Sequence, residues 1–202
     1  MCGRYDLNES PQMLMLYFSL TQEPESFSND DVRPSGLAPI IRAHDGQRTA
    51  SLARWGLLPR WKQEGQPMFN ARGETVAEKP SYRSAFKRRR CIVPVSAFFE
   101  WRPISGQKKK QKLRFTAADG KPLALAGLWE PNHQLATGEG AESYTVITIA
   151  ANAFMAPFHD RMPVILSTDD WATWLDPDGD NPLLLQSMIQ PCPNDMLDVS
   201  PM

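Results

Sequence analysis

The distribution of proline is the feature that most restricts what this chain can fold into. Eighteen prolines are spread over 202 residues, and a proline inside a helix removes a backbone hydrogen bond and clashes with the preceding turn. Long uninterrupted helices are therefore disfavoured, and a chain rich in loops and short elements is favoured. Because 42% of the residues are hydrophobic and 22% are charged, as in ordinary globular proteins, we expect a single α+β domain over residues 1–202.

The amino-terminal segment and the cysteines indicate where such a chain would work. The start, Met-Cys-Gly-Arg-Tyr-Asp, is polar and lacks the apolar stretch of a secretory signal, and no run of about 18 apolar residues is present. The cysteines at positions 2, 91 and 192 are widely spaced without a Cys-x-x-Cys pair, so neither a zinc site nor a disulfide framework is indicated. We expect a reduced, cytoplasmic protein without a metal.

Charge is distributed unevenly although the net charge is only −1. Residues 1–150 carry 21 lysines and arginines against 15 acidic residues, whereas residues 151–202 carry Arg161 as their single basic residue against eight acidic ones. Clustered positive charge can bind phosphate backbones even in a nearly neutral protein. A solvated surface would produce the same split, so composition alone leaves both interpretations open.

Hydrophobic patterns and turn signals predict the secondary structure. Ser10-Pro11 has the form of an N-cap with a first-turn proline, and Asp119-Gly120 between two strand-like runs predicts a β-hairpin. The expected architecture is a curved, barrel-like, mainly antiparallel sheet with a few flanking helices. Helices are predicted over 11–20, 81–87, 168–175 and 182–189, strands over 37–42, 49–58, 91–101, 112–118, 121–129, 143–151 and 164–166, and loops over 21–36 and 65–75.

Cys2 can acquire a property that no other cysteine of the chain can have. Removal of Met1, which is common before a small residue, would leave Cys2 with a free α-amine beside its thiol. Their unperturbed pKa values are about 8 and about 8.5, so both groups are partly deprotonated at neutral pH. Such an aminothiol condenses with an aldehyde to a Schiff base and then to a five-membered thiazolidine. By position alone, Cys2 could equally be an incidental residue at a frayed terminus.

Other polar side chains stand in contexts that suit catalysis or phosphate binding. Glu100 interrupts Phe-Phe-Glu-Trp, where burial would raise its pKa and suit a general acid or base, although strand alternation could turn it to solvent. His159 begins His-Asp-Arg, or is a structural residue of a proline-bounded turn. Asn70 and Arg72 lie in Asn-Ala-Arg-Gly-Glu-Thr, where they could bind a phosphate or serve a helix cap.

Basic runs and aromatic residues share the same part of the chain. The basic runs are Lys-Arg-Arg-Arg at 87–90 and Lys-Lys-Lys at 108–110. Aromatic rings can stack on bases while basic groups follow the phosphate backbone. For the lysine run a solvated hairpin arm is the simpler interpretation, and the aromatic residues could equally form core. The aromatic residues are Trp55, Trp61, Phe69, Phe98, Phe99 and Trp101.

These motifs belong to a longer series of segments in a fixed order. It contains Met-Cys-Gly-Arg at 1–4, Arg-Trp-Gly-Leu-Leu-Pro-Arg-Trp at 54–61, Asn-Ala-Arg-Gly-Glu-Thr-Val-Ala-Glu-Lys-Pro at 70–80, Phe-Lys-Arg-Arg-Arg-Cys-Ile-Val-Pro at 86–94, Phe-Phe-Glu-Trp at 98–101, Ala-Gly-Leu-Trp-Glu at 126–130 and His-Asp-Arg-Met-Pro-Val-Ile-Leu at 159–166. Together they resemble the SOS-response-associated peptidase, or SRAP, family of abasic-site processing proteins, over about residues 2–177.

The resemblance implies a function for most of these residues. A member of this family would bind single-stranded DNA in a basic groove and capture the aldehyde of a ring-opened abasic deoxyribose as a thiazolidine. Cys2 matches the nucleophile, and Asn70, Glu100 and His159 match the other active-site positions. The positions that match contacts to DNA are Arg4, Pro34, Trp55, Arg72 and Arg161.

The resemblance also implies side activities, and two rival functions remain. Removal of Met1 by the protein itself and AP-lyase activity through β-elimination from a Schiff base are expected. The first rival function is a thiol-dependent peptidase that pairs Cys2 with His159, and the second is a protein that binds single strands without forming a covalent bond. No metal or organic cofactor is expected, because the nucleophile belongs to the chain. We expect a monomer that binds abasic single-stranded DNA, has no membrane partner and associates with the nucleoid when bound to DNA.

One segment departs from the family pattern. Where members usually carry an Asn-x-Ala-Pro-Thr-like sequence, this chain reads Asp-Val-Arg-Pro-Ser-Gly at 31–36. Pro34 is retained and could wedge near the lesion, whereas Asp31 and Arg33 introduce opposite charges. We therefore expect the shape and the DNA contacts of this segment to differ from those of other members.

Overall fold

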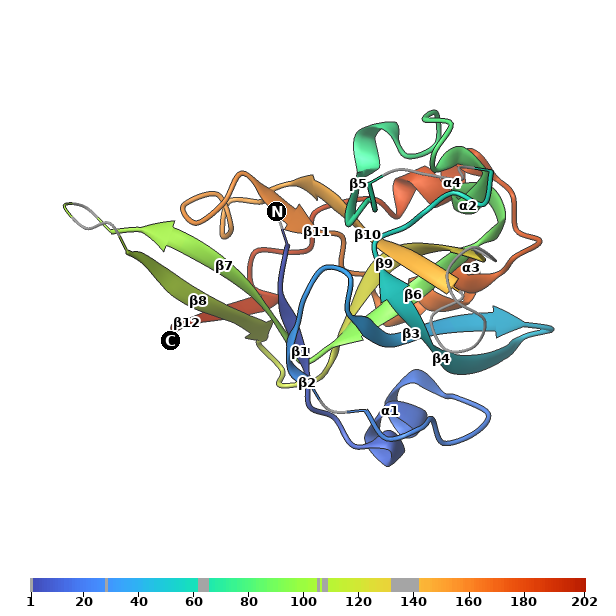
Figure 1. Ribbon diagram of the computed structural model, residues 1–202, viewed down its shortest axis with the longest axis horizontal. Coiled ribbons are helices and arrows are strands. Elements are labelled where there is room, and N and C mark those ends of the chain that lie inside the picture. Colours follow the sequence, from blue (N-terminus) through green and yellow to red (C-terminus); the bar gives the residue numbers. More distant parts are fainter. Residues whose placement is uncertain (1, 28, 62–65, 105, 107–108, 132–141) are drawn as a thin grey trace.

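Two β-sheets form the body of the protein in the computed structural model (Figure 1), which describes every residue except 1, 28, 62–65, 105, 107–108 and 132–141. Five strands form an open sheet in the order β12 (Leu197–Pro201), β8 (Lys110–Ala117), β7 (Ala97–Pro103), β1 (Tyr5–Leu7) and β2 (Asn29–Val32). The second sheet follows the order β11 (Arg161–Pro163), β10 (Glu142–Ala150), β4 (Gln47–Trp55), β3 (Leu37–His44), β6 (Arg90–Val95) and β9 (Leu123–Pro131), with β5 (Asn70–Arg72) paired to β10.

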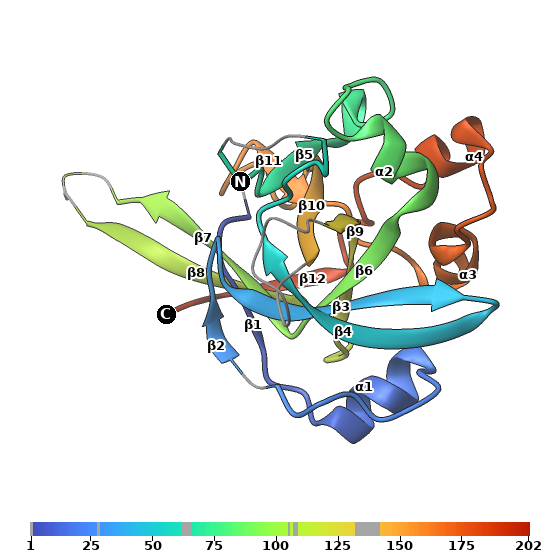
Figure 2. The same ribbon diagram turned by 45° about the vertical axis from the view of Figure 1, so that its right-hand side comes forward.

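Strand pairing in the second sheet closes into a ring. β9 pairs with β10 as well as with β6, so β10, β4, β3, β6 and β9 are connected in a circle, which Figure 2 shows from the side. The pairings are antiparallel except those of β10 with β4 and with β5, which are parallel. The expected α+β class with large, mainly antiparallel sheets is confirmed. The sheet is ring-like only in part, and an open second sheet accompanies it.

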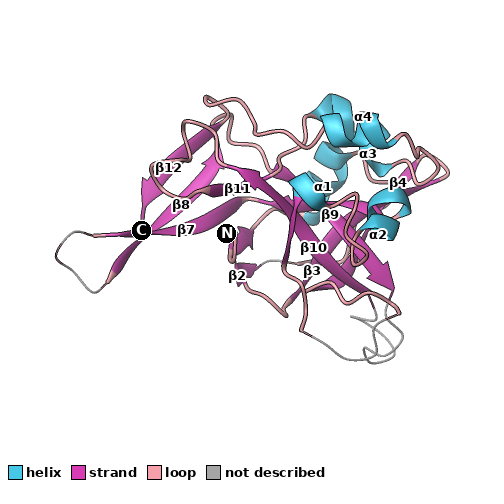
Figure 3. Cartoon of the chain, turned by 90° about the horizontal axis from the view of Figure 1, so that it is seen from above, coloured by secondary structure: helices cyan, strands magenta, loops and turns pink. Residues whose placement is uncertain are grey.

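Short helices flank the sheets. α2 (Arg83–Arg88), α3 (Trp171–Leu175) and α4 (Pro182–Ser187) lie together, far from the end of β7 and the start of β8 (Figure 3). α1 (Pro11–Phe18) begins as predicted, because the Ser10 Oγ accepts the N–H of Met13 at 3.2 Å and Pro11 occupies the first turn. It ends at Ser19, whose φ of 53° is left-handed. Within the described part of the chain, no helix is long and apolar enough to cross a membrane.

The segment 91–101 folds as two strands, and the prediction of a single strand is wrong. β6 ends at Val95 and β7 begins at Ala97. At the break, the Ser96 Oγ accepts the N–H of Asn8 at 2.9 Å and donates to the Glu9 Oε1 at 3.0 Å. β6 belongs to the ring and β7 to the open sheet. A continuous apolar pattern cannot show this change of sheet, because both strands are buried.

The predicted hairpin around Asp119-Gly120 is wrong, although the turn itself forms. Gly120 has a φ of 73°, its N–H donates to the Ala117 carbonyl at 3.0 Å, and the Asp119 Oδ1 accepts the N–H of Lys121 at 3.1 Å. β8, however, pairs with β7 and β12, whereas β9 pairs with β6 and β10. Turn chemistry is local, but the strand partners are set by burial of β9 in the ring.

The remaining differences concern very short strands. β1, β2, β5, β11 and β12 contain three to five residues each, which is too short for periodicity to reveal a strand. Residues 164–166 were predicted as a strand, but only an isolated bridge between Ile165 and Leu125 forms there. These short strands matter for function because β1 and β5 carry residues of the candidate site.

Arg90 ties the helical end of the molecule to β6. Its side chain is 3% exposed, and burial lowers its pKa to about 10, so it stays charged at neutral pH. The guanidinium satisfies carbonyl groups near the ends of α2 and α3, which would otherwise lack partners. Its backbone acceptors are the carbonyl oxygens of Trp174, Phe86, Lys87, Asp176 and Gly179.

Replacing Arg90 with lysine should lower the free energy of unfolding by about 2 kcal/mol, because one ammonium group cannot span carbonyls that the guanidinium bridges and unsatisfied buried polar groups are costly. Urea denaturation monitored by circular dichroism measures the loss. Arg83→Lys, at an exposed position at the start of α2, is the matched control and should behave as wild type. Equal stability of Arg90→Lys and wild type would contradict the bridging role.

Candidate active site at the amino terminus

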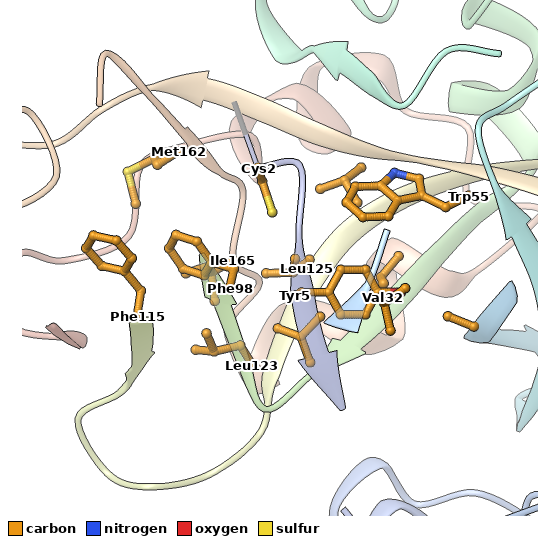
Figure 4. Packing of buried hydrophobic residues seen from close by; sticks show 14 of the residues in the cluster. Cys2, Tyr5, Val32, Trp55, Phe98, Phe115, Leu123, Leu125, Met162 and Ile165 are labelled. Carbon is orange, nitrogen blue, oxygen red and sulfur yellow. The ribbon is translucent and has the colours of Figure 1, made fainter. Parts of the chain in front are cut away.

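Cys2 lies directly before β1, and its sulfur enters the core. The side chain is 0% exposed, and Figure 4 shows the sulfur directed into the cluster that contains Tyr5, Phe98 and Trp55. Burial raises the pKa of the Cys2 thiol well above its usual range, and the nearby Glu100 carboxylate raises it further. The thiol is therefore protonated in this arrangement and needs a base before it can act as a nucleophile. Met1 lies outside the described residues.

β7 carries Glu100 to the neighbourhood of Cys2. β1 and β7 pair antiparallel with Tyr5 opposite Phe98, so Glu100 lies alongside the residues that precede β1. Its side chain is buried, with 5% exposed, which decides against the solvent-facing interpretation. Burial raises the pKa of the Glu100 carboxyl. A carboxyl group whose pKa is raised can give and take protons closer to neutral pH.

β5 brings Asn70 to the same point. β5 runs parallel to β10 with Asn70 opposite Val146, and the Asn70 Nδ2 donates to the Cys2 carbonyl oxygen at 3.0 Å. The Asn70 Oδ1 is buried and accepts no hydrogen bond from the described residues. A buried acceptor without a donor is energetically costly. Oδ1 is therefore suited to receive an N–H or O–H group that arrives beside Cys2.

His159 lies in the loop between β10 and β11, with its side chain 25% exposed. Its Nδ1 accepts the backbone N–H of Arg161 at 2.9 Å, and the Asp160 Oδ1 is also 2.9 Å from this nitrogen. One nitrogen cannot accept and donate at the same time, so the two contacts belong to different protonation states. We assign the amide contact to the neutral ring, because the Asp160 side chain is 87% exposed and well solvated. The neutral ring then carries its proton on Nε2.

Arg72 and Arg161 lie close to this centre but in different surroundings. Arg72 is exposed, on the same face of β5 as Asn70, and no ion pair to it forms within the described residues. Arg161 is 15% exposed, and its Nη2 donates to the Glu74 Oε2 at 2.9 Å and to the Thr148 carbonyl at 2.6 Å. Arg72 is thus open to an external anion, whereas Arg161 already joins β11 to β10 and to the segment that follows β5.

Arg4 and Pro34 lie at β1 and at the turn between β2 and β3. The Nε and Nη2 of Arg4 each contact the Asp31 carboxylate at 2.5 Å, and its guanidinium carbon is 5.4 Å from the centroid of the Trp101 ring. Pro34 is partly exposed in a tight turn that the N–H of residue 36 closes on the Arg33 carbonyl at 2.9 Å. Because Asp31 belongs to β2, it joins this turn to Arg4.

Trp55 does not reach the surface, which corrects its predicted contact with DNA. The side chain is 0% exposed, and its indole N–H donates to the Phe69 carbonyl at 2.8 Å. Its ring packs against Tyr5 at 5.1 Å and Tyr144 at 6.3 Å between centroids. Trp55 is therefore a core residue that supports β1. Among the aromatic residues singled out in the sequence, Trp61 is the exposed one, at 63%.

Some parts of the site were not found from the sequence. Neither Trp101 as the support of Arg4 nor Glu74 as the partner of Arg161 was predicted, because both contacts join segments far apart in the chain. The described part of the chain contains no group of three or more histidine, cysteine or acidic residues that could hold a metal ion. What the geometry brings together is the Cys2 side chain, the Asn70 amide, the Glu100 carboxyl and the His159 imidazole.

The whole chain, residues 1–202, matches the family described as SOS response associated peptidase (SRAP). The abasic site processing protein YoqW of Bacillus subtilis (strain 168) is 38% identical over 200 residues, which cover 95% of this chain and 87% of that protein. The abasic site processing protein HMCES of Xenopus tropicalis is 35% identical over 160 residues, which cover 66% of this chain and 47% of that protein.

Solved structures show the same fold. A crystal structure of a Bordetella bronchiseptica protein matches with a TM-score of 0.82 at 28% identity, covering 100% of this chain and 99% of that chain. A crystal structure of a Bacteroides thetaiotaomicron protein matches with a TM-score of 0.88 at 23% identity, covering 100% and 92%. The match over the full sequence and the identity to YoqW decide the assignment: this chain belongs to the SOS response associated peptidase family.

Proposed function

We propose that this protein captures abasic sites in single-stranded DNA as a covalent adduct with Cys2 once Met1 has been removed. The observation that carries the proposal is the convergence of the Cys2 backbone, the Asn70 amide and the buried Glu100 carboxyl at the start of β1. The relatives named abasic site processing proteins support the class of lesion. Capture would shield the reactive aldehyde during the response to DNA damage.

The first stage joins the amine to the sugar. Hydrolysis of the Met1–Cys2 amide consumes one water and frees the α-amine, which attacks C1′ of the ring-opened deoxyribose. A C–N bond forms, the former carbonyl oxygen leaves as water, and a Schiff base results. Glu100 is suited to deliver the proton that this water needs, because burial raises its pKa. The Asn70 Oδ1 can accept an N–H of the amine, since it has no donor among the described residues.

The second stage closes the ring. The Cys2 thiol gives its proton to a base, its sulfur attacks C1′, and the electrons of the C=N bond return to nitrogen. Glu100 is the favoured base because its charge acts directly on the thiol, and His159 can exchange protons with this pair. One water is lost overall when amine, thiol and aldehyde become a thiazolidine. This condensation changes no oxidation state, so its stoichiometry includes neither an oxidant nor a reductant. Elimination from the Schiff base would give AP-lyase activity.

Charge around the site supports binding of a single strand. Arg72 is exposed next to Asn70, so its guanidinium can grip a backbone phosphate close to the captured sugar. Pro34 stands partly exposed beside Arg33, where its ring can pack against the lesion. Arg161 is already paired with Glu74 through both Nη atoms, so its main role would be to hold the loop that carries His159. It could contact a phosphate through the remaining N–H of Nη1.

The proposal predicts a shifted band when the protein, with loss of Met1 verified by intact mass, meets an oligonucleotide that contains one abasic site. The readout is a denaturing gel, with an undamaged strand as the control. Absence of the band would contradict capture. The rival function, a thiol peptidase with Cys2 and His159, is separated by acetylating only the α-amine. Acetylation should abolish the adduct, whereas a Cys–His peptidase needs only its thiol.

A further inference from the structure

Asp31 lies between two arginines beside the candidate site. Its carboxylate accepts the Nε and Nη2 of Arg4 at 2.5 Å each. The Oδ2 of Asp31 also accepts the Nε of Arg33 at 2.6 Å and pairs with its Nη2. One carboxylate therefore holds two guanidinium groups. The side chains are 29%, 30% and 64% exposed for Arg4, Asp31 and Arg33, so a large anion in solution can reach all three.

Arg4 is fixed from a second side and keeps donors free. Its guanidinium lies over the Trp101 ring, 5.4 Å from the centroid, so the planar group is held by a ring and by a carboxylate. Asp31 occupies the edge formed by Nε and Nη2. The other edge, formed by Nη1 and the second N–H of Nη2, has no hydrogen-bond acceptor among the described residues. A phosphate can bind this outer edge through two parallel N–H groups.

We propose that Asp31 is an internal competitor for DNA phosphate at Arg4 and Arg33. The Asp31 carboxylate binds both guanidinium groups. It therefore occupies the position that a DNA phosphate would take if both arginines bound it. Asp31 thus lowers the charge that the two arginines offer to a DNA backbone. DNA must displace the carboxylate or bind only the outer edge of Arg4. The inference rests on the proposed function, because it names the residue that sets DNA affinity at that site.

The competitor acts throughout the neutral pH range and favours lesions over undamaged strands. Hydrogen bonds from Arg4 and then from Arg33 hold the pKa of Asp31 well below its usual range, so the carboxylate stays ionised. Covalent capture does not require tight reversible binding, because the bond to Cys2 retains the lesion. Weakened phosphate contacts therefore shorten the residence on undamaged DNA without shortening it on captured sites.

Asp31→Asn should bind an undamaged thymidine oligonucleotide about fivefold more tightly than wild type at low salt. The reason is that the arginines no longer have to give up a partly exposed ion pair before they bind phosphate, and a gain of this size is typical of such a pair. The salt dependence of binding should also become steeper, as one more phosphate is neutralised. Asp30→Asn is the matched control, because Asp30 is the exposed preceding residue of β2. It removes the same charge without a described arginine contact and should change affinity less than about twofold. Fluorescence anisotropy measures both.

Equal gains for Asp31→Asn and Asp30→Asn would overturn the inference, since general charge would then explain them. A loss of affinity in Asp31→Asn would also overturn it and would show that Asp31 organises the arginines for DNA. Thermal unfolding verifies that the variants are folded, and Asp31→Ser repeats the test if Asp31→Asn is not. Failure of wild type to form an adduct with abasic DNA would count against the proposed function alone, because the anisotropy comparison uses undamaged DNA.

Discussion

Replacing Cys2 with alanine should abolish the adduct that survives a denaturing gel, while a Schiff base to the same abasic strand can still be trapped with cyanoborohydride. Alanine is small enough for Met1 to be removed and keeps the α-amine, but it has no sulfur to close the ring. The Schiff base hydrolyses when the protein unfolds. Because the Cys2 side chain is fully buried, a small loss of stability, about 1 kcal/mol, should accompany the change.

The control for this experiment is Cys192→Ala. Cys192 is also buried, at 6% exposed, but it lies in the segment before β12 and contacts Asn152 rather than the candidate site. Cys192→Ala should form the stable adduct like wild type. A stable adduct from Cys2→Ala without reductant would show that the product is not a thiazolidine. Absence of a trapped adduct from Cys2→Ala in the presence of cyanoborohydride would show that the α-amine is not the nucleophile.

The candidate residues of the site could be named from the sequence because the proposed chemistry depends on residue type and position. Cys2 is the one cysteine that can become an amino-terminal aminothiol, and Asn70, Glu100 and His159 stand in recognisable segments. Whether Glu100 is buried could not be predicted, since the pattern Phe-Phe-Glu-Trp allows either face. The pairing of β1 with β7 decides this question. Such a pairing joins residues about 90 positions apart, which no local pattern records.

Burial could not be predicted from the sequence at Trp55 or at Cys2. Trp55 stands in a basic segment that suits DNA binding, yet its indole is enclosed between Tyr5 and Tyr144. The predicted DNA contact of Arg4 stays a prediction, and the counter-ion that the structure gives it, Asp31, is 27 positions away. Residue types predict which charges are present. Only the assembled sheets determine which of them are neutralised by a neighbour and which remain available to DNA.

In the fold, too, contacts between neighbouring residues could be predicted from the sequence, whereas contacts between distant strands could not. The cap at Ser10 and the turn at Gly120 form as predicted because their hydrogen bonds join nearby residues. The partners of β8 and β9 were mistaken because the two strands that flank this turn enter different sheets. The single residue Ser96 separates the ring from the open sheet. The change of sheet there brings Glu100 to β1, so the position of this carboxyl group depends on a break that hydrophobicity does not reveal.

Glu100→Gln should slow adduct formation about a hundredfold, which is within the usual contribution of a general acid or base, and should leave the affinity for undamaged DNA unchanged. The amide keeps the size of the side chain but cannot carry the proton between thiol, amine and leaving water. Single-turnover capture of an abasic oligonucleotide gives the rate, and anisotropy gives the affinity. Glu78→Gln, at an exposed position after β5, is the matched control and should capture at the wild-type rate. Equal rates for Glu100→Gln and wild type would refute the proton role.

The pH dependence of stability separates this proton role from damage to the fold. Burial raises the pKa of Glu100 in the folded protein, so its ionised form destabilises that state. Below the unfolded pKa of about 4.3 the carboxyl is neutral in both states and the penalty is absent. The penalty grows as the pH rises and is complete above the folded pKa. Glu100→Gln should therefore melt above wild type at pH 8 and close to it at pH 4. A variant that is more stable at pH 8 yet captures more slowly cannot owe its defect to unfolding.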